Sequence, residues 1–211
     1  MSVGYLIRNG EVHDGSSAPG ARLDVRVRGQ NIAEIGASLP EQGDQVIDAT
    51  GLLVVPGLID LHVHVFSGMG IFSIDPAEAG LRVGVTTMLD TGTAGALTYP
   101  TFHRFVISQA KEDVFALLNI SMIGCIQGHP DIPPYMGDLN DARHAHAPSA
   151  VECIQRYRDR IIGTKVRLTA GLANNREENE RAGLKGALEA AARTGLPCMV
   201  HHVKSSIPTG E

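Results

Sequence analysis

Two histidines interrupt an apolar stretch in the first third of the chain. The stretch reads VVPGLIDLHVHVF, and His62 and His64 are separated within it by a single residue. Because side chains alternate along a β-strand, residues spaced in this way point to the same side. Two imidazoles on one side of a strand end can bind a divalent cation such as zinc. The spacing therefore indicates a metal site, and the alternative is two core histidines that are each hydrogen-bonded. The opposite face of the same segment is apolar and suits packing under helices: Ile59, Leu61, Val63 and Val65.

A lysine occupies an equally unusual place in the segment IIGTKVRL, Ile161 to Leu168. Strand alternation puts Lys165 and Arg167 on one face, which in a barrel would be the interior. A lysine there is costly unless its charge is paired or removed. Reaction of the neutral amine with CO2 would remove the charge, and the resulting carbamate could bridge two metals. The alternative is that Lys165 extends its ammonium group to solvent at the barrel mouth.

Arg167 lies one step further towards the expected mouth, on the same face as Lys165. Its guanidinium group could bind a substrate carboxylate through two parallel hydrogen bonds. A surface ion pair explains an arginine at this position equally simply.

The remaining histidines differ in their settings. His201 and His202 are adjacent, so they face opposite ways on a strand, and His201 faces inward if Cys198 and Val200 face the helices. A second His-x-His pair, His144 and His146, lies in a polar segment and is predicted to be a solvated loop. His129 is interpreted as a loop histidine.

These residues need a scaffold, and the hydrophobic pattern predicts one. Up to about residue 55 the chain has only short strand signals, which indicate a small antiparallel module with a hairpin at Asn9–Gly10. Strand and helix signals then alternate, which is typical of a parallel sheet, either open or closed into a (β/α)8 barrel. Predicted strands cover 58–66, 85–90, 114–124, 161–168 and 197–203; predicted helices begin at caps Asp75 and Ser149 or cover 100–110 and 176–194.

Composition excludes several classes of protein. The 211 residues are 43% hydrophobic and carry a net charge of −5, which argues against a nucleic-acid or anionic-membrane partner. No apolar run reaches the roughly 18 residues that span a bilayer, and the first residues lack an apolar signal core. The three cysteines are far apart and are interpreted as reduced thiols. We therefore expect a cytoplasmic protein.

Four segments in this order resemble the amidohydrolase superfamily: VVPGLIDLHVH, GVTTMLDTGTAG, IIGTKVRL and GLPCMVHHV. The resemblance covers the whole chain and points to the deacetylase-like branch, whose members are often labelled dihydroorotases or acyl-amino-acid deacetylases. It implies a TIM-like barrel, with residues 56–211 as its first half, about five βα units. Residues 1–55 would be part of a β-sandwich that precedes the barrel.

The resemblance also implies roles for residues at matching positions. His62 and His64 would bind one metal, His201 would bind a second, and carboxylated Lys165 would bridge both. Two divalent metal ions, expected to be zinc, would activate a hydroxide that attacks an amide, cyclic amide or acyl-ester carbonyl. The family further requires a histidine on strand six and a general-base aspartate on strand eight, and we expect both downstream of Glu211.

The leading hypothesis is therefore a metal-dependent hydrolase of a small molecule, deacetylase- or dihydroorotase-like, which forms a homo-oligomer when full length. On this hypothesis the chain is the N-terminal half of the enzyme and is inactive alone, because it holds no catalytic aspartate. A second hypothesis is a non-catalytic amidohydrolase-like assembly or interaction protein, or an inactive fragment. A third is an open α/β binding domain without metal. The combination of His62, His64, Lys165 and His201 favours the enzyme.

Overall fold

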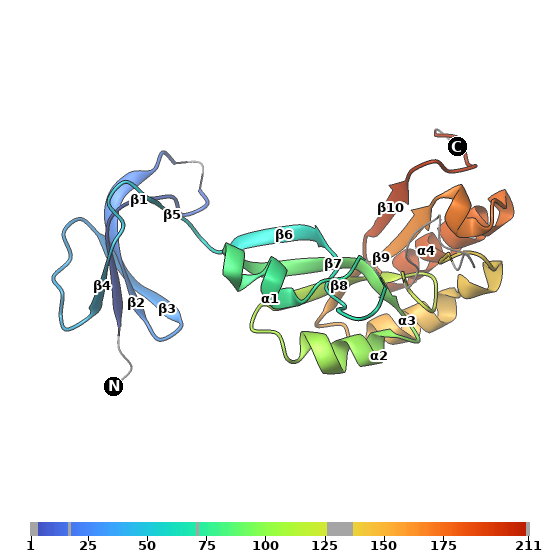
Figure 1. Cartoon of the computed structure of the whole chain (residues 1–211), viewed down its shortest axis with the longest axis horizontal. Coiled ribbons are helices and arrows are strands. Elements are labelled where there is room, and N and C mark those ends of the chain that lie inside the picture. The colour runs from blue at the N-terminus through green and yellow to red at the C-terminus, as the bar shows by residue number, and fades with distance from the viewer. Residues whose placement is uncertain (1–3, 17, 71, 126–136, 210–211) are drawn as a thin grey trace. The chain divides into compact units, whose positions relative to one another are not determined.

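The computed structural model describes residues 4–16, 18–70, 72–125 and 137–209. Its internal contacts divide the chain into two units, Met1–Leu58 and Ile59–Glu211 (Figure 1). The assignment of domains to 1–55 and 56–211 stays a prediction, and His129 lies outside the described residues.

The N-terminal unit is a five-stranded sheet in the order β3-β2-β1-β4, with β5 also paired to β1. The antiparallel prediction holds for the pairs β1–β2 and β2–β3, and it is wrong for β4 and β5, which run parallel to β1. The reason is that residues 37–44 return the chain to the end of the sheet where β1 starts. The strands are β1 (Tyr5–Val12), β2 (Ala21–Arg28), β3 (Asn31–Gly36), β4 (Gln45–Asp48) and β5 (Leu53–Val54).

Asn9 and Gly10 form a bulge within β1 and not the predicted hairpin. Asn9 has a left-handed backbone with φ of 64°, and its N–H donates to Asp24 Oδ1 over 3.0 Å. The register between β1 and β2 shifts at this point, between Ile7 and Gly10. The prediction failed because the tolerance of Asn for positive φ suits a bulge as well as a tight turn.

The second unit is built on a five-stranded sheet in the order β10-β9-β8-β7-β6. The pairs β7–β8, β8–β9 and β9–β10 are parallel, as the alternation of strands and helices predicted. The strands are β6 (Leu58–Val63), β7 (Val85–Gly95), β8 (Asp113–Asn119), β9 (Ile161–Leu168) and β10 (Cys198–His202).

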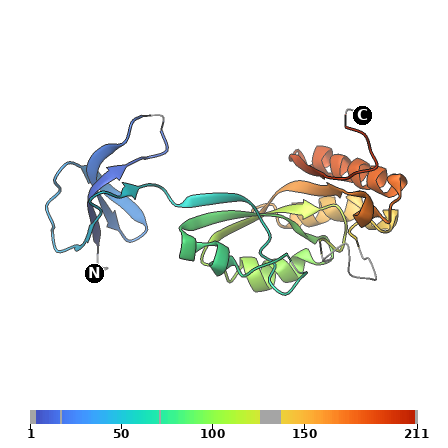
Figure 2. The ribbon, with the colours of Figure 1, turned by 45° about the horizontal axis from the view of Figure 1, so that its top comes forward.

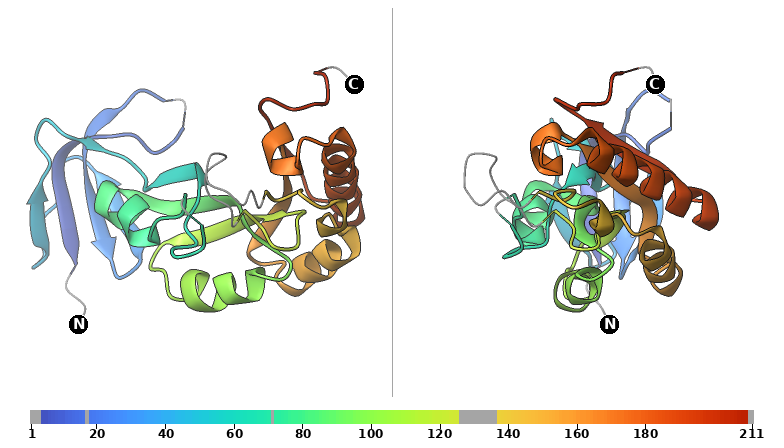
Figure 3. Two further views of the ribbon diagram at one scale, coloured as in Figure 1. Left: turned by 45° about the vertical axis from the view of Figure 1, so that its right-hand side comes forward. Right: turned by 90° about the vertical axis from the view of Figure 1, so that its right-hand side faces the viewer.

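Helices cover one side of this sheet. Figure 2 shows α1 and α2 on one side of β6 and β7, and Figure 3 shows α2, α3 and α4 succeeding one another around the outside of the strands. No helix among the described residues has the length and apolar character needed to cross a membrane. The helices are α1 (Pro76–Ala79), α2 (Tyr99–Phe102), α3 (Ala147–Arg156) and α4 (Glu177–Thr194), and short 3-10 or π turns are η1 (Leu81–Val83), η2 (His103–Ile107), η3 (Ala142–His144) and η4 (Ala170–Ala173).

The helix caps agree with the sequence at α1 but not at α3. Asp75 caps α1 by accepting a hydrogen bond of 2.9 Å from Ala77 N. The predicted cap Ser149 lies inside α3, which begins earlier because His146 accepts from Ser149 N and Pro148 suits the first turn. The prediction of a solvated His144–His146 segment holds for His146, which is exposed and caps α3, whereas His144 is half-buried and ends η3.

The faces of β9 alternate as predicted. Thr164 donates to the carbonyl of Ala187 in α4 over 3.2 Å, so it faces the helices together with buried Val166. Lys165 therefore points to the opposite side of the sheet. This side is the inner face, and it carries the candidate site.

The apolar face predicted for the strand 58–66, of which β6 forms only residues 58–63, is buried only in its second half. Val63 and Val65 are buried, whereas Ile59 and Leu61 are 63% and 66% exposed. The reason is that β6 is the edge strand of the sheet.

Burial between the sheet and the helices predicts where the chain is sensitive to substitution. Leu118 in β8 is fully buried, and Leu188 in α4 is 50% exposed. Leu118→Ala should lower the free energy of unfolding by about 2–5 kcal/mol, because it leaves a cavity. Leu188→Ala, the matched control, should change it by less than about 0.5 kcal/mol. Urea unfolding of both variants checks this, and equal effects would contradict the described packing.

Candidate metal centre

Lys165 lies on the inner face of the sheet, on β9. Its register partners are Asn119 on β8 and Met199 on β10, and its side chain is 1% exposed. The Nζ atom donates to Met199 Sδ over 3.2 Å. Within the described residues no carboxylate forms an ion pair with Lys165. Burial, followed by the nearby charge of Arg167, lowers the pKa of Lys165, which favours the neutral amine.

Gly92 on β7 makes room for this lysine. A Cβ atom at Gly92 would lie 2.6 Å from Lys165 Cγ, and the glycine has a φ of 95°. Both the space and the backbone conformation require a residue without a side chain. Gly92, in the segment GVTTMLDTGTAG, therefore leaves the space that Lys165 occupies, although the two residues belong to strands that are two places apart in the sheet.

His201 lies on the same face as Lys165. It pairs in register with Arg167, and it is two residues after Met199, whose sulfur contacts Lys165. His202 turns the other way, and its Nε2 donates to the carbonyl of Ile207 over 3.0 Å. The prediction that His201 and not His202 faces inward is therefore confirmed.

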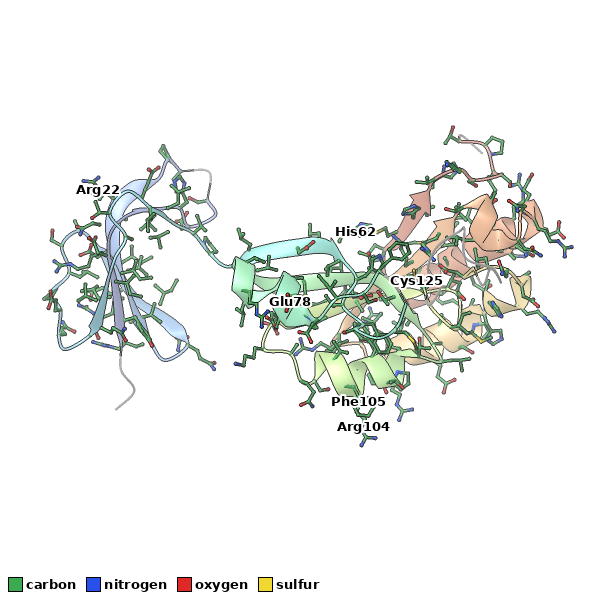
Figure 4. All side chains as sticks on the ribbon, in the orientation of Figure 1. Arg22, His62, Glu78, Arg104, Phe105 and Cys125 are labelled. Carbon is green, nitrogen blue, oxygen red and sulfur yellow. The ribbon has the colours of Figure 1, made fainter. Side chains whose placement is uncertain are left out.

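His62 and His64 lie at the carboxyl end of β6, with ring centroids 5.9 Å apart and ring planes at 72°. Figure 4 shows His62 on the side of the sheet opposite to α2 and to η2, the turn that carries Arg104 and Phe105. His62 is exposed, and His64, just beyond the end of the strand, is half-buried.

The positive charge of Lys165 lowers the pKa of all three histidines, which indicates that the four side chains lie near one another. Burial, then the charge of Lys165, lowers the pKa of His62 and of His201. Burial, then the charges of Arg167, His62 and Lys165, lowers the pKa of His64 to about 4. The histidines are therefore neutral at neutral pH, which is the form that binds a metal.

Two acidic groups near the site were not identified from the sequence. Asp138 is buried, and its carboxylate accepts from Arg167 Nε over 2.7 Å and from Asn119 Nδ2 over 3.2 Å. Asp90 is also buried and accepts from Thr93 Oγ1, which in turn contacts His64 Nδ1. Asp90 could have been suspected, because an acid at the end of the apolar run VTTMLD must find partners. Nothing in the sequence pattern marks Asp138.

Arg167 is held by Asp138 through both Nε and Nη2. The Nε and Nη2 groups of Arg167 could have bound a substrate carboxylate through two parallel hydrogen bonds, but here they bind the carboxylate of Asp138. The substrate role of Arg167 stays a prediction, and in this conformation it would depend on Nη1, which does not contact Asp138.

The donor set fits a divalent metal only if Lys165 takes part. Among the described residues, no three His, Cys, Asp or Glu side chains gather closely enough to hold a metal ion. Within the described part of the chain, Lys165 and the neutral histidines together therefore lack an anionic metal ligand. A carbamate on Lys165 would supply that group, and it would form from the neutral amine that burial favours.

Comparison with known proteins finds similar sequences. A model of the amidohydrolase family matches residues 53–207. A deacetylase of Agrobacterium fabrum is 34% identical over 155 residues, which are 72% of this chain and 37% of that protein. A dihydroorotase of Citrifermentans bemidjiense is 34% identical over 149 residues, 66% of this chain and 34% of that protein.

Solved structures give the same result. The crystal structure of a dihydroorotase superposes with a TM-score of 0.82 at 26% identity, covering 96% of this chain and 52% of that one. An adenine deaminase superposes with a TM-score of 0.74 at 28% identity, covering 98% of this chain and 52% of that one. The five-stranded sheet therefore matches part of the barrel of these enzymes. The chain spans 36% to 42% of the length of the three deacetylases it resembles.

The electrostatic coupling predicts a measurable pH dependence. In the metal-free protein His64 should stay neutral down to about pH 4, against its ordinary value of 6.5. Since the unfolded chain takes up the proton more readily, the free energy of unfolding should fall as the pH drops from 6.5 towards 4. Lys165→Met should raise the pKa of His62, His64 and His201, because it removes a positive charge that lowers all three.

NMR titration of the histidine ring protons measures these values. Lys185→Met is the matched control, since Lys185 is on α4 and not among the causes of these shifts. Identical histidine titrations in the Lys165→Met variant and the unchanged protein would show that Lys165 does not share the space of the histidines.

Proposed function

The chain belongs to the amidohydrolase family, and from this premise we propose that the protein is a metal-dependent hydrolase of amide, cyclic amide or acyl-ester bonds in a small molecule. The observation that carries the proposal is Lys165, a buried lysine that forms no ion pair with a carboxylate among the described residues and that lowers the pKa of three histidines at the ends of strands. Active sites of barrel enzymes are at this end of the strands. Relatives named deacetylase and dihydroorotase support the choice of bond.

We assign the metal ligands to His62, His64, His201 and a carbamate on Lys165. Two divalent ions, expected to be zinc, would supply polarisation of the scissile carbonyl and a water of lowered pKa. The strands determine which residues can take part. Lys165 lies on β9, between the histidine on β10 and the strands that lead to β6, so a group on its tip is central to the donor set.

The protein's own residues prepare the site in two ways. Burial and neighbouring positive charge keep the histidine rings neutral, so their nitrogen lone pairs are available at neutral pH. Burial of the Lys165 amine favours its neutral form, which is the form that reacts with CO2. The nitrogen of the amine attacks the carbon of CO2, so that a C–N bond forms while one C=O π bond opens onto oxygen, and the nitrogen then loses a proton to solvent water to leave the carbamate anion.

The substrate is proposed to be an anionic small molecule. Arg167 Nη1 remains to donate to a carboxylate after Nε and Nη2 are engaged by Asp138. N-acyl amino acids and dihydroorotate both carry a carboxylate in addition to the amide bond to be cleaved. A homo-oligomeric assembly of the full-length protein stays a prediction.

The first test concerns metal and activity together. The full-length protein with zinc should hydrolyse an N-acetyl amino acid or dihydroorotate, and replacing His62 and His64 together by alanine should remove both activity and bound metal. The second His-x-His pair provides the control, since His144→Ala with His146→Ala should keep the metal content unchanged. Metal analysis by mass spectrometry and a product assay measure the two effects. Full metal content in the His62 and His64 double variant would refute the assignment, and a metal-loaded protein without hydrolysis would favour a non-catalytic role.

Carboxylation of Lys165 gives the second test. With labelled bicarbonate, the metal-bound protein should show a carbamate carbon signal by ¹³C NMR that is absent in Lys165→Ala and present in Lys185→Ala. Lys165→Ala should also bind less metal and lose activity, because the bridging anion is gone, and added acetate or propionate should restore part of both. An unmodified Lys165 beside two bound metals would contradict this part of the proposal.

A further inference from the structure

We propose that Thr93 and Asp90 are positioning residues that fix the tautomer and orientation of His64, so that its Nε2 is the ring nitrogen offered to a ligand. The inference rests on the proposed function only in taking the ligand of His64 to be a metal. The first test of the inference uses the metal-free protein, so its outcome does not depend on whether the proposed function is correct.

The hydroxyl of Thr93 determines which ring nitrogen carries the proton. Thr93 Oγ1 lies 2.7 Å from His64 Nδ1 and donates to Asp90 Oδ2 over 2.7 Å. A hydroxyl has one proton, and here that proton is committed to the carboxylate. Thr93 can therefore only accept from His64, so Nδ1 carries the hydrogen and Nε2 keeps its lone pair.

Asp90 can accept because four donors converge on its carboxylate. The backbone N–H groups of Val65, Gly92 and Thr93 donate over 2.9, 3.1 and 2.8 Å, and the Thr93 hydroxyl is the fourth donor. On balance the pKa of Asp90 is raised, because burial outweighs these hydrogen bonds, each of which favours the ionised form. With every contact supplied by a donor, the carboxylate acts only as an acceptor.

The same carboxylate also holds the backbone beside His64. Asp90 Oδ2 accepts from Val65 N, and the carbonyl of His64 accepts from Ile74 N over 3.1 Å. The peptide bond after His64 is thus fixed at both its oxygen and its nitrogen. Backbone and ring are anchored through one buried group, which leaves the His64 ring little freedom.

His62 lacks such support. Its backbone N–H donates to Asp60 Oδ1 over 2.9 Å, but among the described residues its ring nitrogens have no hydrogen-bond partner. The two histidines of the pair therefore differ. The ring of His64 is oriented before any ligand binds, whereas the ring of His62 must be oriented by its ligand.

A neighbouring threonine provides a matched control. Thr91 and Thr93 both belong to β7 and are both buried. The hydroxyl of Thr91, however, has no hydrogen-bond partner among the described residues. Thr→Val keeps the shape of the side chain and removes the hydroxyl, so the same change at the two positions separates the hydrogen bond from the packing.

The first measurement is the tautomer of His64 in metal-free, ¹⁵N-labelled full-length protein at about pH 8, by long-range ¹H–¹⁵N correlation. His64 should carry its proton on Nδ1 in the unchanged protein, in Thr91→Val and in Thr93→Ser, which retains the hydroxyl. Thr93→Val should lose this preference. A proton on Nε2 of the unchanged protein overturns the inference without any variant, so the test survives if Thr93→Val does not fold.

The second measurement is zinc affinity by competition with a chromophoric chelator. Thr93→Val should weaken binding about 10–100-fold, as is usual when a partner of a metal-binding histidine is removed. Thr91→Val and Thr93→Ser should bind as tightly as the unchanged protein. Equal affinities of Thr93→Val and Thr91→Val would overturn the positioning role. If no variant binds zinc while the tautomer changes as expected, the positioning stands and the proposed function fails.

Discussion

The inner face of the parallel sheet depends on one constraint, the burial of an amine that forms no ion pair with a carboxylate in the part of the chain that the structure describes. Lys165 is 1% exposed, and its nitrogen contacts a thioether. A glycine on β7 provides the space for its side chain. A charged ammonium group at such a place is costly, so the surroundings favour loss of the charge. The proposed carboxylation of Lys165 is one chemical way to remove this charge.

The neighbouring charges are distributed consistently with this constraint. Arg167, on the same face, is neutralised within the protein by Asp138, which Asn119 also contacts. The positive charge of Lys165 has no such partner among the described residues, and it acts instead on the histidines by lowering the pKa of each. The site therefore combines neutral imidazoles with an excess of positive charge. An anion formed on Lys165 itself would relieve that excess and complete a donor set for divalent cations.

The elements of the second unit could be predicted because each had a periodic signal. β9 and α4 follow the expected ranges closely, since alternation in IIGTKVRL and the acidic start and glycine end of the helix are local features. The errors occurred where one local signal serves two structures. Asn9–Gly10 suits a bulge as well as a hairpin, and Ser149 suits the first turn of a helix whose cap is His146. In the N-terminal unit the pattern could not reveal that β4 and β5 pair in parallel with β1, because pairing depends on the path of the chain and not on the strand itself.

The sequence by itself determined the family, the order of strands and helices, and the faces on which Lys165 and His201 lie, because alternation along a strand is a local property. Only the tertiary structure decided what those residues meet. Asp138 is separated from Arg167 by most of β9 and the helix before it, and Asp90 reaches His64 through Thr93 from another strand. Such contacts are made between segments that are distant in the chain, and each depends on the register and packing of neighbouring strands. The periodicity of one segment does not reveal its register with the neighbouring strands. The residues that pair with a buried charge can therefore be identified only from the assembled sheet.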